Sequence, residues 1–203
     1  MRRRQHPARL AVLVLGALTA SGCGVKTAGL DVRYPEAGVN RSLLASAPPR
    51  RVEVLPVADR RADTRRIGTR DGGDIVTSRP VTDIVGEALL LEVKKNGHTV
   101  TGDRKDVILA GAVEEFRLDV VDAYSSRQYV GRVVLAVTLA DPRSGETLLI
   151  RRYVGISRRV VDKDSDNGWR GIMDVALART MHDFATDPEL ASVVARQLTA
   201  FNP

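Results

Sequence analysis

Cys23 is the residue whose surroundings most clearly predict a chemical reaction. It directly follows the small residues Ala20-Ser21-Gly22, which are preceded by a basic start and an apolar stretch over residues 10–18. A basic segment, an apolar segment too short to span a bilayer and a small-residue cleavage site are typical of a secretory signal. Because lipid attachment needs a thiol at the first residue of the mature chain, the pattern predicts cleavage between Gly22 and Cys23 and acylation of Cys23 with palmitate or a similar chain.

The cysteine count supports acylation of Cys23. This residue is the only cysteine in the 203 residues, so no disulfide can form within the chain. A lone thiol in an oxidising compartment is reactive, and acylation removes it. The alternative, an ordinary secretory signal with an incidental cysteine, leaves that thiol free. We therefore favour the lipoprotein interpretation.

The histidines and serines of the mature chain give no catalytic or metal-binding pattern. His98 and His182 are not spaced as zinc ligands are, and a structural role is expected for each. Ser144 and Ser157 lack the Gly-x-Ser-x-Gly sequence of a hydrolase nucleophile. We therefore expect no catalytic residue and no cofactor, and we predict that the protein is not an enzyme.

The loop Asp162-Lys-Asp-Ser-Asp-Asn-Gly168 has the alternating carboxylates of a calcium-binding loop. Counted from Asp162, its sixth position is Asn167 rather than glycine, and its twelfth is Met173, where calcium needs a bidentate Glu. Asp and Asn are favoured helix caps, so Asp166 or Asn167 is expected to cap the following helix instead. We therefore predict no metal site.

The segment Arg70-Asp-Gly-Gly-Asp74 lies between two β-type segments, 67–69 and 75–77. A phosphate-binding loop needs several glycines that open a helix. A Gly-Gly pair between two strands is instead typical of a β-hairpin, which we predict here.

The charge distribution argues against nucleic acid as a partner. The sequence has 31 Lys and Arg against 25 Asp and Glu, but four of the arginines and none of the acidic residues lie in residues 1–22. The mature chain is therefore close to neutral and lacks the basic excess of nucleic-acid-binding domains. Local basic pairs are expected on strand edges, where they prevent association, or against anionic lipid headgroups or an acidic partner. These pairs are Arg60-Arg61, Arg65-Arg66, Arg151-Arg152 and Arg158-Arg159.

Hydrophobic spacing predicts an amphipathic helix over residues 82–95. Its apolar residues lie three or four apart, and its last turn is basic. Thr82 or, one turn earlier, Ser78 is expected to cap its N-terminus. Asn96-Gly97 predicts a left-handed stop at its C-terminus.

The remaining elements complete an α+β pattern. Residues 106–122 predict a long strand whose second half places Phe116, Leu118 and Val120 on one face and whose first half is apolar on both faces, as in a sheet only partly covered by helices. The other expected elements are a strand near 51–57, strands over 132–140 and 147–159, a helix from Trp169, expected as a core residue, to 184, and a short helix over 189–198. This order predicts an α+β fold with a mostly antiparallel sheet, two main helices packed on one face of it and a short C-terminal helix.

The chain is expected to have three parts. Residues 1–22 form the lipoprotein signal peptide. Residues 23–49 carry the lipidated cysteine and a flexible tether, because they are rich in small residues and prolines and show no sustained periodicity. Residues 50–203 form a single periplasmic α+β domain that packing alone must stabilise.

The signal, strands and helices occur in an order shared with a known group of bacterial proteins. The relevant segments are the lipobox cysteine Cys23, a first strand Val52-Glu-Val-Leu-Pro-Val-Ala-Asp-Arg-Arg61, a helix end Lys94-Lys-Asn-Gly-His-Thr-Val100 and the long strand from Asp106. Together they resemble the YajG family of lipoproteins over roughly residues 23–196. More distantly, the arrangement is similar to the auxiliary lipoproteins of ABC-type lipid transport systems. The resemblance implies an outer-membrane lipoprotein and supplies no catalytic residue.

Function is expected at the cell envelope. Gly24, rather than Asp, follows the cysteine, which favours the outer membrane by analogy with the sorting rule of enteric bacteria. We expect a lipid-anchored, periplasm-facing accessory protein that binds an envelope protein through a sheet edge or an uncovered sheet face. The alternative is an auxiliary subunit of an ABC-type envelope lipid transporter, which needs a continuous apolar groove beside the Phe116-Leu118-Val120 face. An envelope enzyme, the third class, needs a cleft with a perturbed acid or base that the sequence does not assemble.

Overall fold

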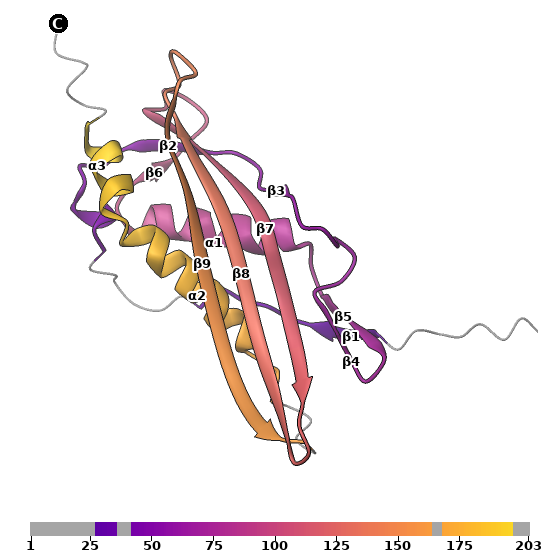
Figure 1. Ribbon diagram of the computed structural model, residues 1–203. Helices are drawn as coiled ribbons and strands as arrows, with labels where there is room; N and C mark the ends of the chain where they lie inside the picture. The colour runs from indigo at the N-terminus through magenta and orange to yellow at the C-terminus, as the bar shows by residue number, and fades with distance from the viewer. Residues whose placement is uncertain (1–26, 36–41, 164–167, 197–203) are drawn as a thin grey trace, which may run out of the picture.

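Three long antiparallel strands form the body of the protein. The computed structural model describes residues 27–35, 42–163 and 168–196. In it, β7 (Val107–Asp122) pairs with β8 (Ser126–Ala140), which pairs with β9 (Thr147–Asp162). The helices α1 (Val81–Lys95) and α2 (Ile172–Ala185) lie behind these strands in Figure 1, and the short α3 (Pro188–Arg196) follows α2. The predicted α+β fold is therefore confirmed.

Six short strands extend this sheet beyond β7. They are β1 (Thr27–Leu30), β2 (Arg51–Val54), β3 (Ala58–Asp59), β4 (Gly68–Arg70), β5 (Gly73–Thr77) and β6 (Thr99–Val100). The strands β2, β3 and β4 pair in parallel with successive parts of the outer edge of β7, at residues 107–109, 112–113 and 118. The outer edge of β7 thus pairs with three separate short strands, and parts of this edge between them have no strand partner among the described residues.

The core lies between the long strands and the helices. Leu135, Tyr153 and Phe184 are among its buried residues, and the rings of Tyr153 and Phe184 meet edge to face with centroids 5.6 Å apart. Two glycines let α2 approach the sheet closely. A Cβ atom at Gly155 would collide with the carbonyl of Ala176, and one at Gly131 would press against Ile172. Helix and sheet are therefore in near-backbone contact there.

The two ends of α1 differ in how well the sequence predicted them. At the C-terminus Gly97 takes a left-handed φ of 83°, its N–H donates to Lys94, and the His98 N–H donates to Val93, so the predicted stop is confirmed. At the N-terminus Pro80 occupies the cap position, and no side chain caps the helix. The predicted capping by Thr82 or Ser78 is wrong, because the Ser78 hydroxyl points instead to Asp31.

The predicted hairpin is confirmed as β4 and β5. Its register pairs Arg70 with Gly73, so the two turn residues are Asp71 and Gly72, with φ values of 51° and 76°. Positive φ at both central residues is the geometry of a type I′ hairpin turn, and Asp-Gly is a preferred sequence for it. The second glycine of the pair therefore begins β5 rather than forming the turn.

Strand β8 starts earlier than the expected 132–140. Residues Ser126 to Gly131 extend it back to the turn that follows β7, and Tyr129 in this extension is completely buried. Likewise β9 extends to Asp162, beyond the expected end near 159. Trp169 is buried, as predicted, but it lies in a turn, and α2 begins only at Ile172. Within the described residues, no helix combines the length and apolar character needed to cross a bilayer.

The segment expected to be a flexible tether is partly folded. Thr27–Leu30 forms β1 and pairs in parallel with β5, and Leu30 and Val32 are buried. Further along, the Ser42 hydroxyl donates to Asn96, and Leu44 packs into the core. The prediction of a tether over 23–49 is wrong for these described residues, because isolated apolar side chains in short segments carry no periodicity yet fill the space beside β5 and α1.

Candidate functional site

The predicted lipidation site lies outside the part of the chain that the structure describes. Gly22 and Cys23 both precede the first described residue, Thr27, where β1 begins. Acylation of Cys23 therefore stays a prediction from the sequence. The structure does fix the position of Thr27, the first described residue, which pairs with Asp74 near the start of β5.

The two histidines lie in very different environments. His98 is buried, its Nδ1 accepts a hydrogen bond from the Arg50 N–H, and its Nε2 donates to the Leu44 carbonyl 3.2 Å away. Burial lowers its pKa below the ordinary value of 6.5. Both ring nitrogens hold backbone groups together, which confirms a structural role. His182 is exposed on α2.

The serines and carboxylates considered as reactive groups are not assembled into a site. Ser144 is exposed in the β8–β9 turn, where its hydroxyl accepts the Glu146 N–H, whereas Ser157 is buried on β9. Asp162 is the exposed last residue of β9, and residues 164–167 of the carboxylate loop lie outside the described residues. Elsewhere in the described ranges, no three His, Cys, Asp or Glu side chains gather as metal ligands would.

No described element covers the face of the long strands opposite the helices (Figure 1). On β8 the odd-numbered residues point toward the helices, so the even-numbered ones lie on this second face. The register places Ala110, Thr138 and Ile150 in one row across the three strands, and Val121, Gln128 and Val160 in another. Ile150, Val160 and Val121 are 67%, 63% and 55% exposed. We call this the open face, and it presents aliphatic side chains to the surroundings.

Ion pairs cross the middle of the open face. The Arg132 Nε lies 3.0 Å from Glu115 Oε2, and Arg117 Nε lies 3.3 Å from Asp119 Oδ2. Near them, Arg152 Nε donates to Glu114 at 2.5 Å. Each of these three arginines has a carboxylate beside it on a neighbouring or the same strand. The open face is therefore mixed in character, with paired charges between two aliphatic ends.

A groove borders the open face at the outer edge of β7. The chain leaves this edge after β3, at Asp59, and returns to it only at Gly68, so no described strand pairs with the outer edge of β7 between residues 114 and 117. A Cβ atom at Gly68 would collide with the carbonyl of Leu118, which explains the glycine at this point of return. The groove has a volume of about 930 Å³, and its lining includes Ile67, Phe116, Leu118, Val120, Val121 and Val130.

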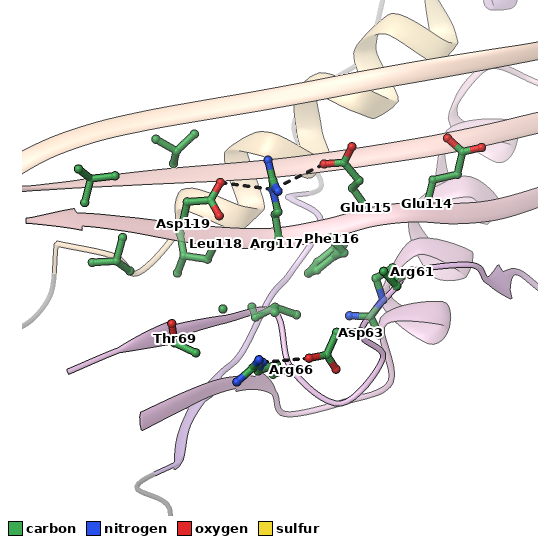
Figure 2. Close-up of a pocket in the computed structure, with 16 residues that line it drawn as sticks. Arg61, Asp63, Arg66, Thr69, Glu114, Glu115, Phe116, Arg117, Leu118 and Asp119 are labelled. Carbon is green, nitrogen blue, oxygen red and sulfur yellow. Dashed lines mark hydrogen bonds and ion pairs between the residues drawn. The ribbon is translucent and has the colours of Figure 1, made fainter. Parts of the chain in front are cut away.

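Charged side chains line the rim of this groove, as Figure 2 shows. Arg66 pairs with Asp63 at 2.9 Å on the loop side, and Arg117 lies between Glu115 and Asp119 on the β7 side. A backbone hydrogen bond from Arg65, with help from Arg66, holds the pKa of Asp63 below its usual range. Asp63 therefore stays ionised and paired near neutral pH. Among the described residues, the rim offers paired charges rather than an acid or base prepared for proton transfer.

Arg61 closes one end of the groove. Its side chain is only 6% exposed, and its Nη2 donates to Asp59 at 2.7 Å and to the Thr64 carbonyl at 3.1 Å. The hydrogen bonds from Arg61 lower the pKa of Asp59. Because Asp59 neutralises the guanidinium, Arg61 organises the loop over residues 60–67 rather than offering a free charge to a ligand.

The predicted Phe116-Leu118-Val120 face is confirmed as the helix-facing side of β7, with Phe116 and Leu118 buried. The sequence also indicated partial coverage of the sheet, because the first half of β7 is apolar on both faces. Its second apolar row, Ile108 and Ala110, lies half-buried on the open face. The groove was missed, since it depends on where the loop over residues 60–67 leaves β7.

Comparisons with known proteins show the fold. No protein-family model and no curated protein matches the chain in sequence. Among solved structures, a Xanthomonas campestris protein of the family DUF330 is 14% identical with a TM-score of 0.50, over 87% of this chain and 100% of that one. A candidate lipoprotein from Caulobacter crescentus is 16% identical with a TM-score of 0.44, over 78% and 97%. A minor lipoprotein from Acinetobacter baumannii is 14% identical with a TM-score of 0.36, over 74% and 93%. The chain therefore shares its fold with the DUF330 protein.

Proposed function

We propose that this chain is a lipoprotein, anchored to the outer membrane by acyl chains on Cys23, that binds another envelope protein through the open face. Support for the anchor comes from the signal sequence and the small residues that precede Cys23. Gly24, in place of the Asp that retains lipoproteins in the inner membrane of enteric bacteria, supports the outer membrane. The role is accessory rather than catalytic, because the carboxylates along the groove are held in ion pairs with arginines.

The single observation that carries the binding role is the exposure of aliphatic side chains on the open face. Ile150 is 67% exposed and Val160 63%, although both lie in regular strands that a helix layer could have covered. Protein interfaces combine an apolar centre with arginine and paired charges at the rim. The row from Ala110 to Ile150, beside the Arg152–Glu114 pair, has this composition.

Site-specific photo-crosslinking in cells tests this role. A photoreactive phenylalanine analogue at Ile150 is expected to give a discrete adduct with an envelope protein. The same analogue at Asp183, exposed on α2 behind the sheet, is the matched control and is expected to give none. Ile150→Glu should weaken the association, measured by co-purification, without unfolding the domain. Equal adducts at both positions, or none at Ile150, would contradict binding by the open face.

The groove beside β7 favours a second candidate, an auxiliary subunit of an envelope lipid transporter. Its volume of about 930 Å³ lies within the range of small-molecule pockets, and the partly exposed Val120, Val121 and Val130 supply an apolar wall. Native mass spectrometry of the Cys23→Ser protein, which carries no acyl chain of its own, distinguishes the two roles. Bound phospholipid that is lost in Val130→Glu would support lipid handling. Protein free of lipid would leave partner binding as the favoured role.

A further inference from the structure

The β7–β8 hairpin ends in a fully exposed tyrosine. The Ala123 N–H donates to the Ser126 carbonyl at 2.8 Å, so Tyr124 and Ser125 form a two-residue turn, and Tyr124 is 99% exposed. Two-residue hairpin turns favour Gly, Asn and Asp, as the Asp71-Gly72 turn of β4–β5 illustrates. Tyr124 buries almost none of its surface within the described residues. Neither the turn geometry nor the core therefore accounts for an aromatic residue there.

Further apolar side chains lie beside this tip. The register places Val121 of β7 and Val160 of β9 on either side of Gln128, near the end of the open face. Both valines are more than half exposed. The adjacent Arg158 and Arg159 on β9 are exposed as well. This end of the sheet thus combines an aromatic ring and two aliphatic side chains with exposed arginines and with the exposed carboxylates of Asp122 and Asp162. We call Val121, Tyr124 and Val160 the tip cluster.

Thr27, the first described residue, lies on the side of the sheet that carries this tip. Thr27 pairs with Asp74 in β5, next to the Asp71-Gly72 turn, and Arg127 joins that turn to the base of the β7–β8 hairpin. The Arg127 Nη2 lies 2.8 Å from Asp71, and its Nε lies 2.5 Å from Asp122. These two hydrogen-bonded carboxylates raise the pKa of Arg127, so the connection stays charged.

The short stretch of chain between Cys23 and Thr27 limits how far the predicted anchor can lie from the tip cluster. Thr27 follows Cys23 by four positions in the chain, and four residues span at most about 14 Å. The opposite end of the long strands, the turn over residues 141–146, is polar and contains no aromatic residue. A strand the length of β8 is on the order of 50 Å long, so that turn lies far from any surface that holds Cys23. Figure 1 shows the two turns at opposite ends of the strands.

We propose that the tip cluster inserts into the interface of the membrane that holds the acylated Cys23. This inference rests on the proposed acylation. Tyrosine is enriched at membrane interfaces, because its ring lies among apolar groups while its hydroxyl stays hydrated. A lipid anchor alone leaves a domain free to rotate, and a second contact adds affinity and fixes its orientation. With the tip in the interface, the long strands rise away from the membrane and the open face stays accessible from the side.

Tryptophan fluorescence of the lipidated full-length protein tests the proposal. Tyr124→Trp and, as the matched control, Ser144→Trp in the opposite turn are purified with their acyl chains and placed in vesicles of phosphatidylethanolamine and phosphatidylglycerol. Mass spectrometry first establishes whether Cys23 is acylated. The signal of buried Trp169 is subtracted with the unsubstituted protein. The indole introduced at position 124 is expected to shift to the blue and to be quenched by brominated acyl chains, whereas the one at position 144 is expected to do neither.

Each outcome separates the two proposals. Acylated protein whose indole at position 124 is not quenched overturns insertion of the tip cluster and leaves the anchor intact. Equal quenching at both positions also overturns it, because the domain then has no fixed orientation. A blue shift at position 124 without quenching by brominated lipid indicates a protein contact and overturns the lipid assignment. Protein without acyl chains on Cys23 overturns both proposals. Selective quenching at position 124 supports the insertion.

Discussion

The two faces of the long strands are formed by alternate residues of the same three segments, yet they differ in burial and in charge. The helix-facing side buries Leu135, Tyr153 and the closely approached Gly155 under α2. The open face, one residue along in each strand, exposes Ile150 and pairs its charges side by side. Side chains of similar β-propensity thus form the core on one face and stay exposed on the other.

This difference shows how to separate folding from function in this protein. Truncating an apolar side chain on the covered side leaves a cavity, and enlarging one creates a clash, whereas truncating one on the open face changes little besides solvent exposure. Variants of the open face can therefore test partner binding in a folded domain.

Phe184→Ala is expected to have the largest effect. Phe184 is completely buried on α2 and packs edge to face on Tyr153. Its truncation should lower the free energy of unfolding by about 3–5 kcal/mol, measured by urea denaturation followed by circular dichroism. The matched variant Ile150→Ala, on the open face, should change it by less than about 0.5 kcal/mol. Similar losses in both variants would mean that the open face is covered.

Gly155→Ala is expected to come next. An added methyl group meets the Ala176 carbonyl and Thr180, so α2 must move away from the sheet at a cost of about 1–3 kcal/mol. The control is Arg158→Ala, an exposed position on the same strand, with little change expected. Thermal melting of both variants measures the difference. A stable Gly155→Ala protein would show that the contact between α2 and β9 is loose.

Buried His98 is expected to make a smaller contribution to the free energy of unfolding, and this contribution should depend on pH. Its pKa is lowered by burial, so the unfolded chain binds a proton more readily than the folded one. The stabilisation is therefore present above pH 6.5 and is lost as the pH falls toward the lowered pKa. Urea denaturation at several pH values should show this loss in the native protein and a weaker one in His98→Gln. His182→Gln, on the exposed side of α2, should keep the native pH profile.

Arg152→Ala is expected to have the smallest effect on stability. The Arg152–Glu114 pair lies on the open face with both side chains partly exposed, and such pairs contribute at most about 1 kcal/mol. We expect a change in unfolding free energy near the error of the measurement, together with a weaker adduct at position 150 in the crosslinking assay. A large loss of stability would assign this pair to the fold rather than to recognition.

Signals local to a few residues predicted their elements well. Asn96-Gly97 ended α1 as expected, because a left-handed stop depends only on neighbouring backbone groups. The hairpin around Asp71-Gly72 formed for the same reason. Residues 126–131 were missed as part of β8, because the polar Arg127 is buried there only through Asp71 and Asp122, which come from other parts of the sheet.

The N-terminal segment shows the limit of local reasoning most clearly. Thr27–Leu30 is too short for a periodic pattern, and β1 exists because β5 offers it a parallel edge. Likewise, Tyr34 donates a hydrogen bond to the buried Glu92 of α1, a contact that no spacing in either segment indicates. Such pairings depend on tertiary neighbours.

The α+β class, the covered Phe116-Leu118 side of β7 and the prediction of an acylated Cys23 could be read from the sequence, because each follows from the order or spacing of nearby residues. Three other features depend on tertiary contacts: the pairing of Thr27–Leu30 with β5, the groove beside the loop between Asp59 and Gly68, and the position of Tyr124 on the same side of the sheet as Thr27. These features arise where strands distant in sequence meet β7 or end beside it, and the geometry of such meetings is set by packing rather than by local pattern.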